Sequence, residues 1–189
     1  MDDRHAHRRP LQGRHRQRRD PARVTGTIVR DGYAGYTHLT DALHAWCGAH
    51  LLRDLAAFHR VEPDRQVWAK AMADLLIDAH YHAQNARAAG ADRINAQTLT
   101  DLRRRYLGAY TAGIRDNDNR ADPLSRDAAT LARRFCDHQD MILRFVVDLA
   151  LPFTNYPDAV LMPMSVVRSG CAAGPVSYTH LTLPTNREV

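Results

Sequence analysis

Three long stretches of helical periodicity occupy most of the middle of the chain. In residues 66–89, 98–114 and 122–152, apolar residues recur at the spacing that lines one face of an α-helix. The three stripes consist of Val67, Ala71, Leu75, Ala79 and Ala86; of Leu99, Leu102, Tyr106 and Tyr110; and of Leu124, Leu131, Phe135, Ile142, Phe145 and Leu149. Such helices must bury their apolar faces against one another, so the sequence predicts a helical bundle packed beside a small sheet.

The ends of these helices carry signals of their own. Gly90 is a typical residue to stop the first helix. Asp122 is a suitable N-cap for the third, and Pro123 is tolerated in its first turn. Pro152 is expected to end that helix because it cannot donate a backbone hydrogen bond. A shorter apolar stripe predicts one more helix over residues 50–59.

Two short segments before the helices predict strands. Residues 24–30 are rich in β-branched side chains, and the turn-forming pair Asp31-Gly32 ends them. Residues 45–49 are apolar and short enough for a second strand, although periodicity alone does not decide the structure of so short a run. The expected fold is therefore mainly α with a small β element.

The basic character of the chain is confined to its first segment. Residues 1–23 carry eight arginines and three aspartates, which accounts for the whole formal net charge of +5. With almost no apolar residues, this segment cannot bury a core and is predicted to be disordered. It is either a basic arm that contacts phosphate or the out-of-frame translation of DNA rich in G and C. The second hypothesis is favoured, since Lys70 is the only lysine in the chain.

Two further classes of protein are disfavoured by composition. No apolar run reaches the roughly 18–20 residues that a membrane-spanning helix needs, and no signal peptide is recognisable. Cys47, Cys136 and Cys171 are few, odd in number and widely spaced, so a disulfide framework is not expected. We expect a cytoplasmic protein.

Two sets of residues are candidates for metal chemistry. Asp31 follows a predicted strand, where a carboxylate can point into a site, and hard divalent cations prefer such oxygen ligands. The pair Asp31-Gly32 is equally common in ordinary turns. His44, Cys47 and His50 could indicate zinc, but no second pair of ligands follows, so a structural role is favoured.

Several separated motifs resemble the catalytic core of IS66-family transposases. They are Asp31-Gly32-Tyr33-Ala34-Gly35-Tyr36, the run from His44 to Leu55, Leu131-Ala132-Arg133-Arg134-Phe135, and the run from Leu143 to Asn155. The resemblance covers residues 24–155 and implies an RNase H-like (DDE) core interrupted by a helical insertion. It implies that Asp31 is a catalytic, metal-binding residue and that Mg²⁺ is the cofactor. It also implies that intact relatives cleave and join DNA at transposon ends, and that the protein can form a homo-oligomer.

The chain departs from the family pattern in two places. The family's first catalytic Asp lies upstream, where this chain has the arginine-rich segment. Its catalytic Glu should fall four residues after Asn155, at Ala159. The chain's two glutamates, Glu62 and Glu188, do not match that position. The resemblance therefore implies a truncated, inactive copy in which Asp31 is the recognisable catalytic residue.

The last part of the chain, residues 156–189, resembles no known family. Within it, residues 176–185 resemble the in-frame translation of a mosaic-end sequencing adapter, and they are therefore left out of the expected fold. Two alternatives to a truncated transposase stay open at this point. The chain could be a non-catalytic helical module that binds DNA or a partner, or a reading frame created by sequence assembly.

Overall fold

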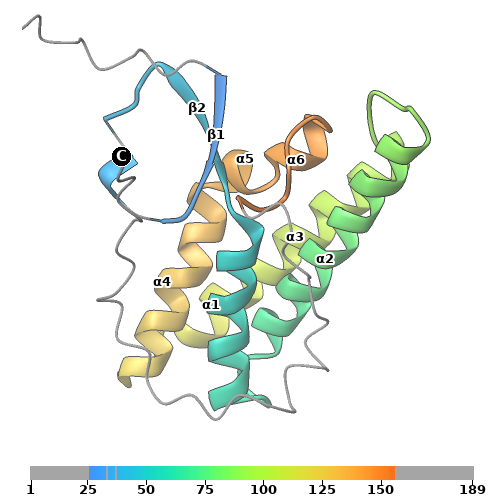
Figure 1. Cartoon of the computed structure of the whole chain (residues 1–189). Helices are drawn as coiled ribbons and strands as arrows, with labels where there is room; N and C mark the ends of the chain where they lie inside the picture. The colour runs from blue at the N-terminus through green and yellow to red at the C-terminus, as the bar shows by residue number, and fades with distance from the viewer. Residues whose placement is uncertain (1–25, 33, 37, 156–189) are drawn as a thin grey trace, which may run out of the picture.

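The computed structural model describes residues 26–32, 34–36 and 38–155, and they form a helical bundle with a small sheet at one end (Figure 1). The predicted disordered segment 1–23 and the tail 156–189 lie outside the described residues. The elements are β1 (Gly26–Arg30), the short 3-10 helix η1 (Ala34–Tyr36), β2 (Ala42–Trp46), α1 (Gly48–Val61), α2 (Val67–Ala88), α3 (Ala96–Asn117), α4 (Pro123–Asp137), α5 (Gln139–Ile142) and α6 (Arg144–Val147). The prediction of a mainly α fold with a small β element is confirmed.

The sheet consists of two parallel strands. β1 and β2 pair in the register that sets Gly26 opposite Ala42 and Arg30 opposite Trp46. The first strand was predicted, but the second begins and ends earlier than the predicted run 45–49, and Gly48 already belongs to α1. The bounds of the second strand were predicted wrongly because the apolar run 45–49 spans the junction between β2 and α1, and both elements are buried there.

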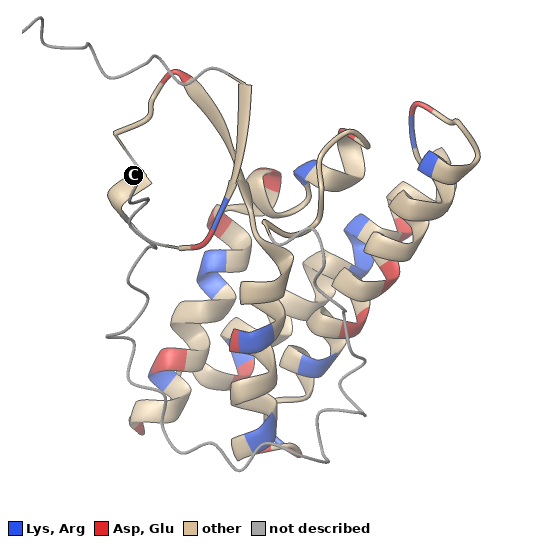
Figure 2. Cartoon of the chain, in the orientation of Figure 1, with Lys and Arg blue, Asp and Glu red and all other residues tan. Residues whose placement is uncertain are grey.

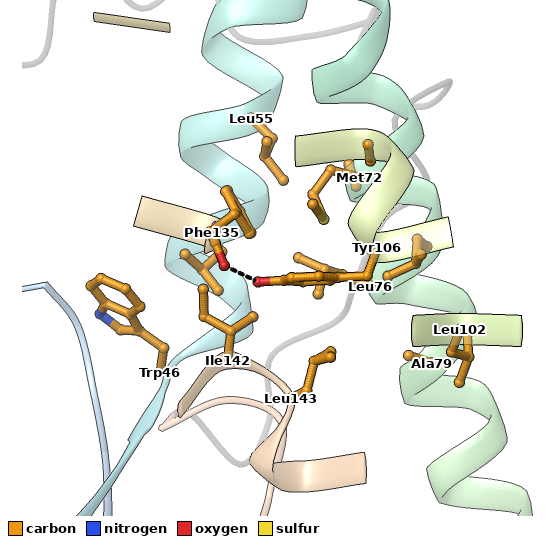
Figure 3. Close-up of a cluster of buried hydrophobic side chains, with 14 of the residues drawn as sticks. Trp46, Leu55, Met72, Leu76, Ala79, Leu102, Tyr106, Phe135, Ile142 and Leu143 are labelled. Carbon is orange, nitrogen blue, oxygen red and sulfur yellow. Dashed lines mark hydrogen bonds between the residues drawn. The ribbon is translucent and has the colours of Figure 1, made fainter. Parts of the chain in front are cut away.

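The bundle closes around one continuous core, to which all of the longer helices contribute (Figure 3). Leu55, Met72 and Leu76 meet Tyr106 and Phe135 there, and all five side chains are fully buried. Each buried side chain of this size contributes about 1.5–3 kcal/mol. The Tyr106 hydroxyl donates to the Phe135 carbonyl at 2.8 Å. Burial raises the pKa of Tyr106 well above its ordinary value, so this hydroxyl stays a neutral donor.

The buried face of α2 differs from the predicted stripe. Leu75 and Ala79 are buried as expected, but Val67 is 59% exposed. The buried face instead includes Trp68 and Met72. The reason is that α2 lies between α1 and α3 and packs against both, so its buried face is broader than one stripe and is not centred on it.

The ends of α2, α3 and α4 follow the sequence signals. Gly90, just after α2, has a φ of +70°, in the left-handed region that favours glycine. The Asp122 side chain accepts a hydrogen bond from the Ser125 amide at 2.9 Å and caps α4 as predicted. Asn95 caps α3 by accepting from the Gln97 amide at 2.8 Å, a cap that the sequence analysis missed.

The predicted helix over 122–152 is broken into α4, α5 and α6, so the expectation that it continues to Pro152 was wrong. The breaks fall at His138 and Leu143, whose backbones leave the helical conformation. At the first break the His138 ring meets the Trp46 ring edge-on, with centroids 4.8 Å apart. Two changes of direction let the chain wrap around the end of β2, which a straight helix could not do.

After α6 the chain runs back across α2 without regular structure. Arg87 holds it there by donating to the Leu149 carbonyl at 2.7 Å and to the Leu151 carbonyl at 2.9 Å. Because an arginine has several fixed donors, one side chain can bind two carbonyl groups at once. None of the described helices is both long and apolar enough to cross a membrane.

Candidate functional site

Asp31 directly follows β1, at the carboxyl end of the parallel pair. Cys47 occupies the equivalent place after β2, and its amide donates to the Arg30 carbonyl at 2.7 Å. The carboxyl ends of parallel strands share one edge of a sheet, and ligands commonly bind outside such an edge. We call the described residues that follow the two strands here, Asp31, Cys47 and Gly48, the strand-end edge.

The loop that follows Asp31 is held by hydrogen bonds from both strands. Arg30 donates from Nε to His44 Nδ1 at 2.8 Å and from Nη1 to the Asp31 carbonyl at 3.0 Å. The other ring nitrogen of His44 lies 3.1 Å from the Leu39 carbonyl. Because Nδ1 accepts, the proton of a neutral His44 belongs on Nε2, where it can be donated to Leu39. The backbone on both sides of the loop is therefore fixed.

The end of the described chain returns to the same edge from far along the sequence. The Gly48 amide donates to the Phe153 carbonyl at 2.8 Å. The Cys47 thiol donates to Asn155 Oδ1 at 2.9 Å, across a sequence separation of 108 residues. Two motifs of the sequence analysis, the run around Asp31 and the run ending at Asn155, are thus brought to one edge of the sheet.

Basic side chains from the last helices approach β2. Arg144 donates to the His44 carbonyl at 3.0 Å. The Arg134 guanidinium lies 5.6 Å from the centre of the Trp46 ring and 3.3 Å from an Asp54 oxygen. Burial raises the pKa of Asp54, against the opposing attraction of nearby cations that include Arg134. These arginines hold β2 against the bundle.

The internal arginine triplet at 103–105 does not form a separate basic stripe. Arg104 pairs with Asp101 at 2.6 Å, and Arg105 pairs with Asp78 at 2.5 Å. Both signs of charge are interspersed along the visible helices (Figure 2). The triplet is therefore part of a solvated face on which both signs of charge are paired.

The described residues do not assemble a metal site. His44 uses its ring nitrogens for Arg30 and Leu39, and Cys47 uses its thiol for Asn155. No group of three or more His, Cys, Asp or Glu side chains that could hold a metal occurs within residues 26–32, 34–36 and 38–155. The structural role favoured for the His/Cys set is consistent with this geometry. Asp31 is not joined there by the further ligands that a two-metal centre requires, so these residues alone do not fit one.

The sequence analysis did not predict the contacts that three residues make at the edge, although two of them lie in the family-like run that ends at Asn155. Phe153 is buried, Arg30 links both strands, and Asn155 accepts from the thiol. Gly48 gave a usable signal, since a glycine within an apolar run predicted as a strand often marks a place where another backbone approaches closely. The partner that approaches it could not be identified, because it lies more than a hundred residues away.

The comparison with protein families agrees with the motifs. The sequence model described as "Transposase IS66 family" matches residues 7–157. The match begins upstream of the expected boundary near residue 24 and so reaches into the arginine-rich segment. No curated protein and no solved structure matches the chain significantly. Because the family match spans well over half of the sequence and ends beside Asn155, the chain belongs to the IS66 transposase family.

Proposed function

We propose that this chain is the catalytic region of a DDE-type transposase, with an RNase H-like core interrupted by the helices α2 to α6. Its membership of the IS66 family supports a transposase function. The observation that carries the finer proposal is the contact between Cys47 and Asn155. This contact brings the run that ends at Asn155 to the strand-end edge, which includes Asp31. In the family, the last catalytic residue follows this run.

In this proposal Asp31 is a metal-binding catalytic carboxylate and DNA at transposon ends is the substrate. In two-metal phosphoryl transfer, Mg²⁺ ions activate the attacking oxygen and stabilise the leaving oxygen. A single aspartate does not hold such a pair, and Ala159 stands where the family pattern has its glutamate. We therefore propose that this copy is a truncated, inactive relative. A cytoplasmic location belongs to the same proposal.

Incubating the purified full chain with Mg²⁺ and duplex DNA that carries the ends of an IS66-type element tests the proposed inactivity. We expect selective binding of the end sequences over scrambled DNA and no metal-dependent cleavage. The variant Asp31→Asn should behave like the unsubstituted chain. Cleavage that requires Mg²⁺ and is abolished by Asp31→Asn would show that the copy is active. Equal binding to end and scrambled DNA would argue against the transposon-end substrate.

The bundle also supports a second candidate, a non-catalytic module that binds DNA or a partner. The observation that favours it is the closed core of α1 to α4, which does not depend on a complete sheet. A mobility shift of duplex DNA that weakens with salt and survives deletion of residues 1–23 would support this function. A shift that disappears with the deletion would indicate that the arginine-rich segment alone attracts the DNA. Size-exclusion chromatography of the same samples tests the proposed homo-oligomer.

A further inference from the structure

Cys47 and Gly48 join β2 to α1, and two distant segments meet at this junction. The Cys47 amide binds the Arg30 carbonyl at the end of β1, and the Gly48 amide binds the Phe153 carbonyl. The Cys47 thiol, which has no exposed surface, binds Asn155. The junction therefore links the end of β1 to the end of the described chain.

Apolar packing fixes Phe153 independently of the thiol. Its ring lies so close to Gly48 that a Cβ atom there would stand 2.0 Å from the nearest ring carbon. The rings of His80 and Phe145 each lie 4.7 Å from it, centroid to centroid. By contrast, Asn155 is exposed, and the side-chain hydrogen bond that the structure shows for it is the one from Cys47. Thr154 is buried as well, so the thiol acts on the next residue and holds the Asn155 side chain at the junction.

We propose that Cys47 is a positioning residue of the strand-end edge. By donating to Asn155, it holds that residue beside the strand-end edge, instead of letting it turn toward solvent. The catalytic meaning of this role rests on the proposed transposase function, but the contact itself does not. A thiol is a weak donor, so the hydrogen bond from Cys47 should hold Asn155 in place without contributing much to overall stability.

Thiol labelling of the full chain tests the proposal, with Cys47 and the exposed Cys136 followed separately by peptide mass spectrometry. Cys136 serves as the internal standard of reactivity. We expect Asn155→Ala to speed the labelling of Cys47 roughly two- to fivefold, the effect of one lost weak hydrogen bond on a local opening. The urea midpoint should fall only slightly, because the folded state loses the same weak hydrogen bond. Asn155→Asp keeps the acceptor and should retain protection, and the exposed Asn119→Ala should behave like the unsubstituted chain.

A second pair of variants examines the donor. The backbone order parameter of Asn155, measured by nuclear magnetic relaxation, should fall in Cys47→Ala and recover in Cys47→Ser, which restores a donor. The proposal fails if Asn155→Ala leaves Cys47 protected, or if Cys47 is labelled only through global unfolding, with the full urea dependence of that transition. If the labelling behaves as expected but the chain binds no transposon-end DNA, the positioning role of Cys47 stands and the proposed transposase function fails.

Discussion

The imidazole ring of His80 stacks on the phenyl ring of Phe153, with centroids 4.7 Å apart and planes inclined by 28°. His80 belongs to α2, whereas Phe153 lies at the end of the described chain and touches Gly48. Helix α2 and the strand-end edge are therefore connected through one aromatic pair. Burial first, and the Arg87 charge second, lower the pKa of His80 below its ordinary value of 6.5.

This lowered pKa predicts a pH dependence of stability. The folded state binds a proton at His80 less readily than the unfolded state does, so the free energy of unfolding should fall as pH drops from about 6.5 through the folded pKa. Above that range His80 is neutral in both states and contributes no pH dependence. His80→Phe keeps an aromatic ring and should remove this part of the acid sensitivity in urea titrations. His82→Gln, an exposed change on the same helix, should retain it.

The contact between Gly113 and Trp68 predicts opposite effects of two substitutions on α3. A Cβ atom at Gly113 would lie 2.6 Å from the Trp68 ring and 2.8 Å from the Cβ of Ala132, so Gly113→Ala should lower stability by about 1–3 kcal/mol. Gly108 has open space around its Cα, and Gly108→Ala should raise stability by about 0.5–1 kcal/mol. Urea denaturation measures both. Similar values for the two variants would contradict the close packing of α2, α3 and α4.

The buried amide pair Gln66 and Asn117 predicts a large cost for removing one partner. Gln66 donates to Asn117 Oδ1 at 2.8 Å and accepts from Trp68 Nε1 at 2.7 Å. Asn117→Ala leaves a buried donor without its acceptor, which should cost about 1–3 kcal/mol in the free energy of unfolding. Asn119→Ala, in the exposed turn after α3, should change it by less than about 0.5 kcal/mol. Equal effects would show that the amide pair is not buried as described.

The proposed role of Asp31 predicts weak binding of a divalent cation at the strand-end edge. Paramagnetic Mn²⁺, added to the isotope-labelled chain, should broaden the amide signals of Arg30 and Gly32 before those of the helices. Asp31→Asn should remove this broadening because it removes the anionic oxygen ligand. Asp41→Asn, at the other end of the same loop, is the matched control. Broadening that persists in Asp31→Asn would place the cation elsewhere.

The parts of the fold that depend on local sequence were predictable. The cap at Asp122 follows from its side chain, and the end of α2 follows from the positive φ that Gly90 adopts without strain. The apolar stripes likewise predicted that the long helices exist. The breaks at His138 and Leu143 were not predictable, since the apolar stripe runs through both. At His138 the break coincides with a contact with Trp46, which belongs to a different element.

The candidate site divides in the same way. Asp31 could be selected because a strand and a turn signal surround it, and the family motif supported it. The hydrogen bond between Cys47 and Asn155 could not be predicted, because it joins residues 108 positions apart and no sequence motif indicates that they are in contact. Whether Asp31 binds a metal stays a prediction.

The two hydrogen bonds from Arg87 to Leu149 and Leu151 restrict insertions and deletions differently before and after Arg87. In evolution, the part of the turn between α2 and the buried Ile94 can change in length, since Arg87 already holds the chain that returns from α6. A deletion earlier in α2 would rotate and shift Arg87 along the helix. The segment that contains Leu149 and Leu151 would then have to move with it, or the two hydrogen bonds would be lost. Variation among relatives should therefore gather at the outer tip of this hairpin and spare its base.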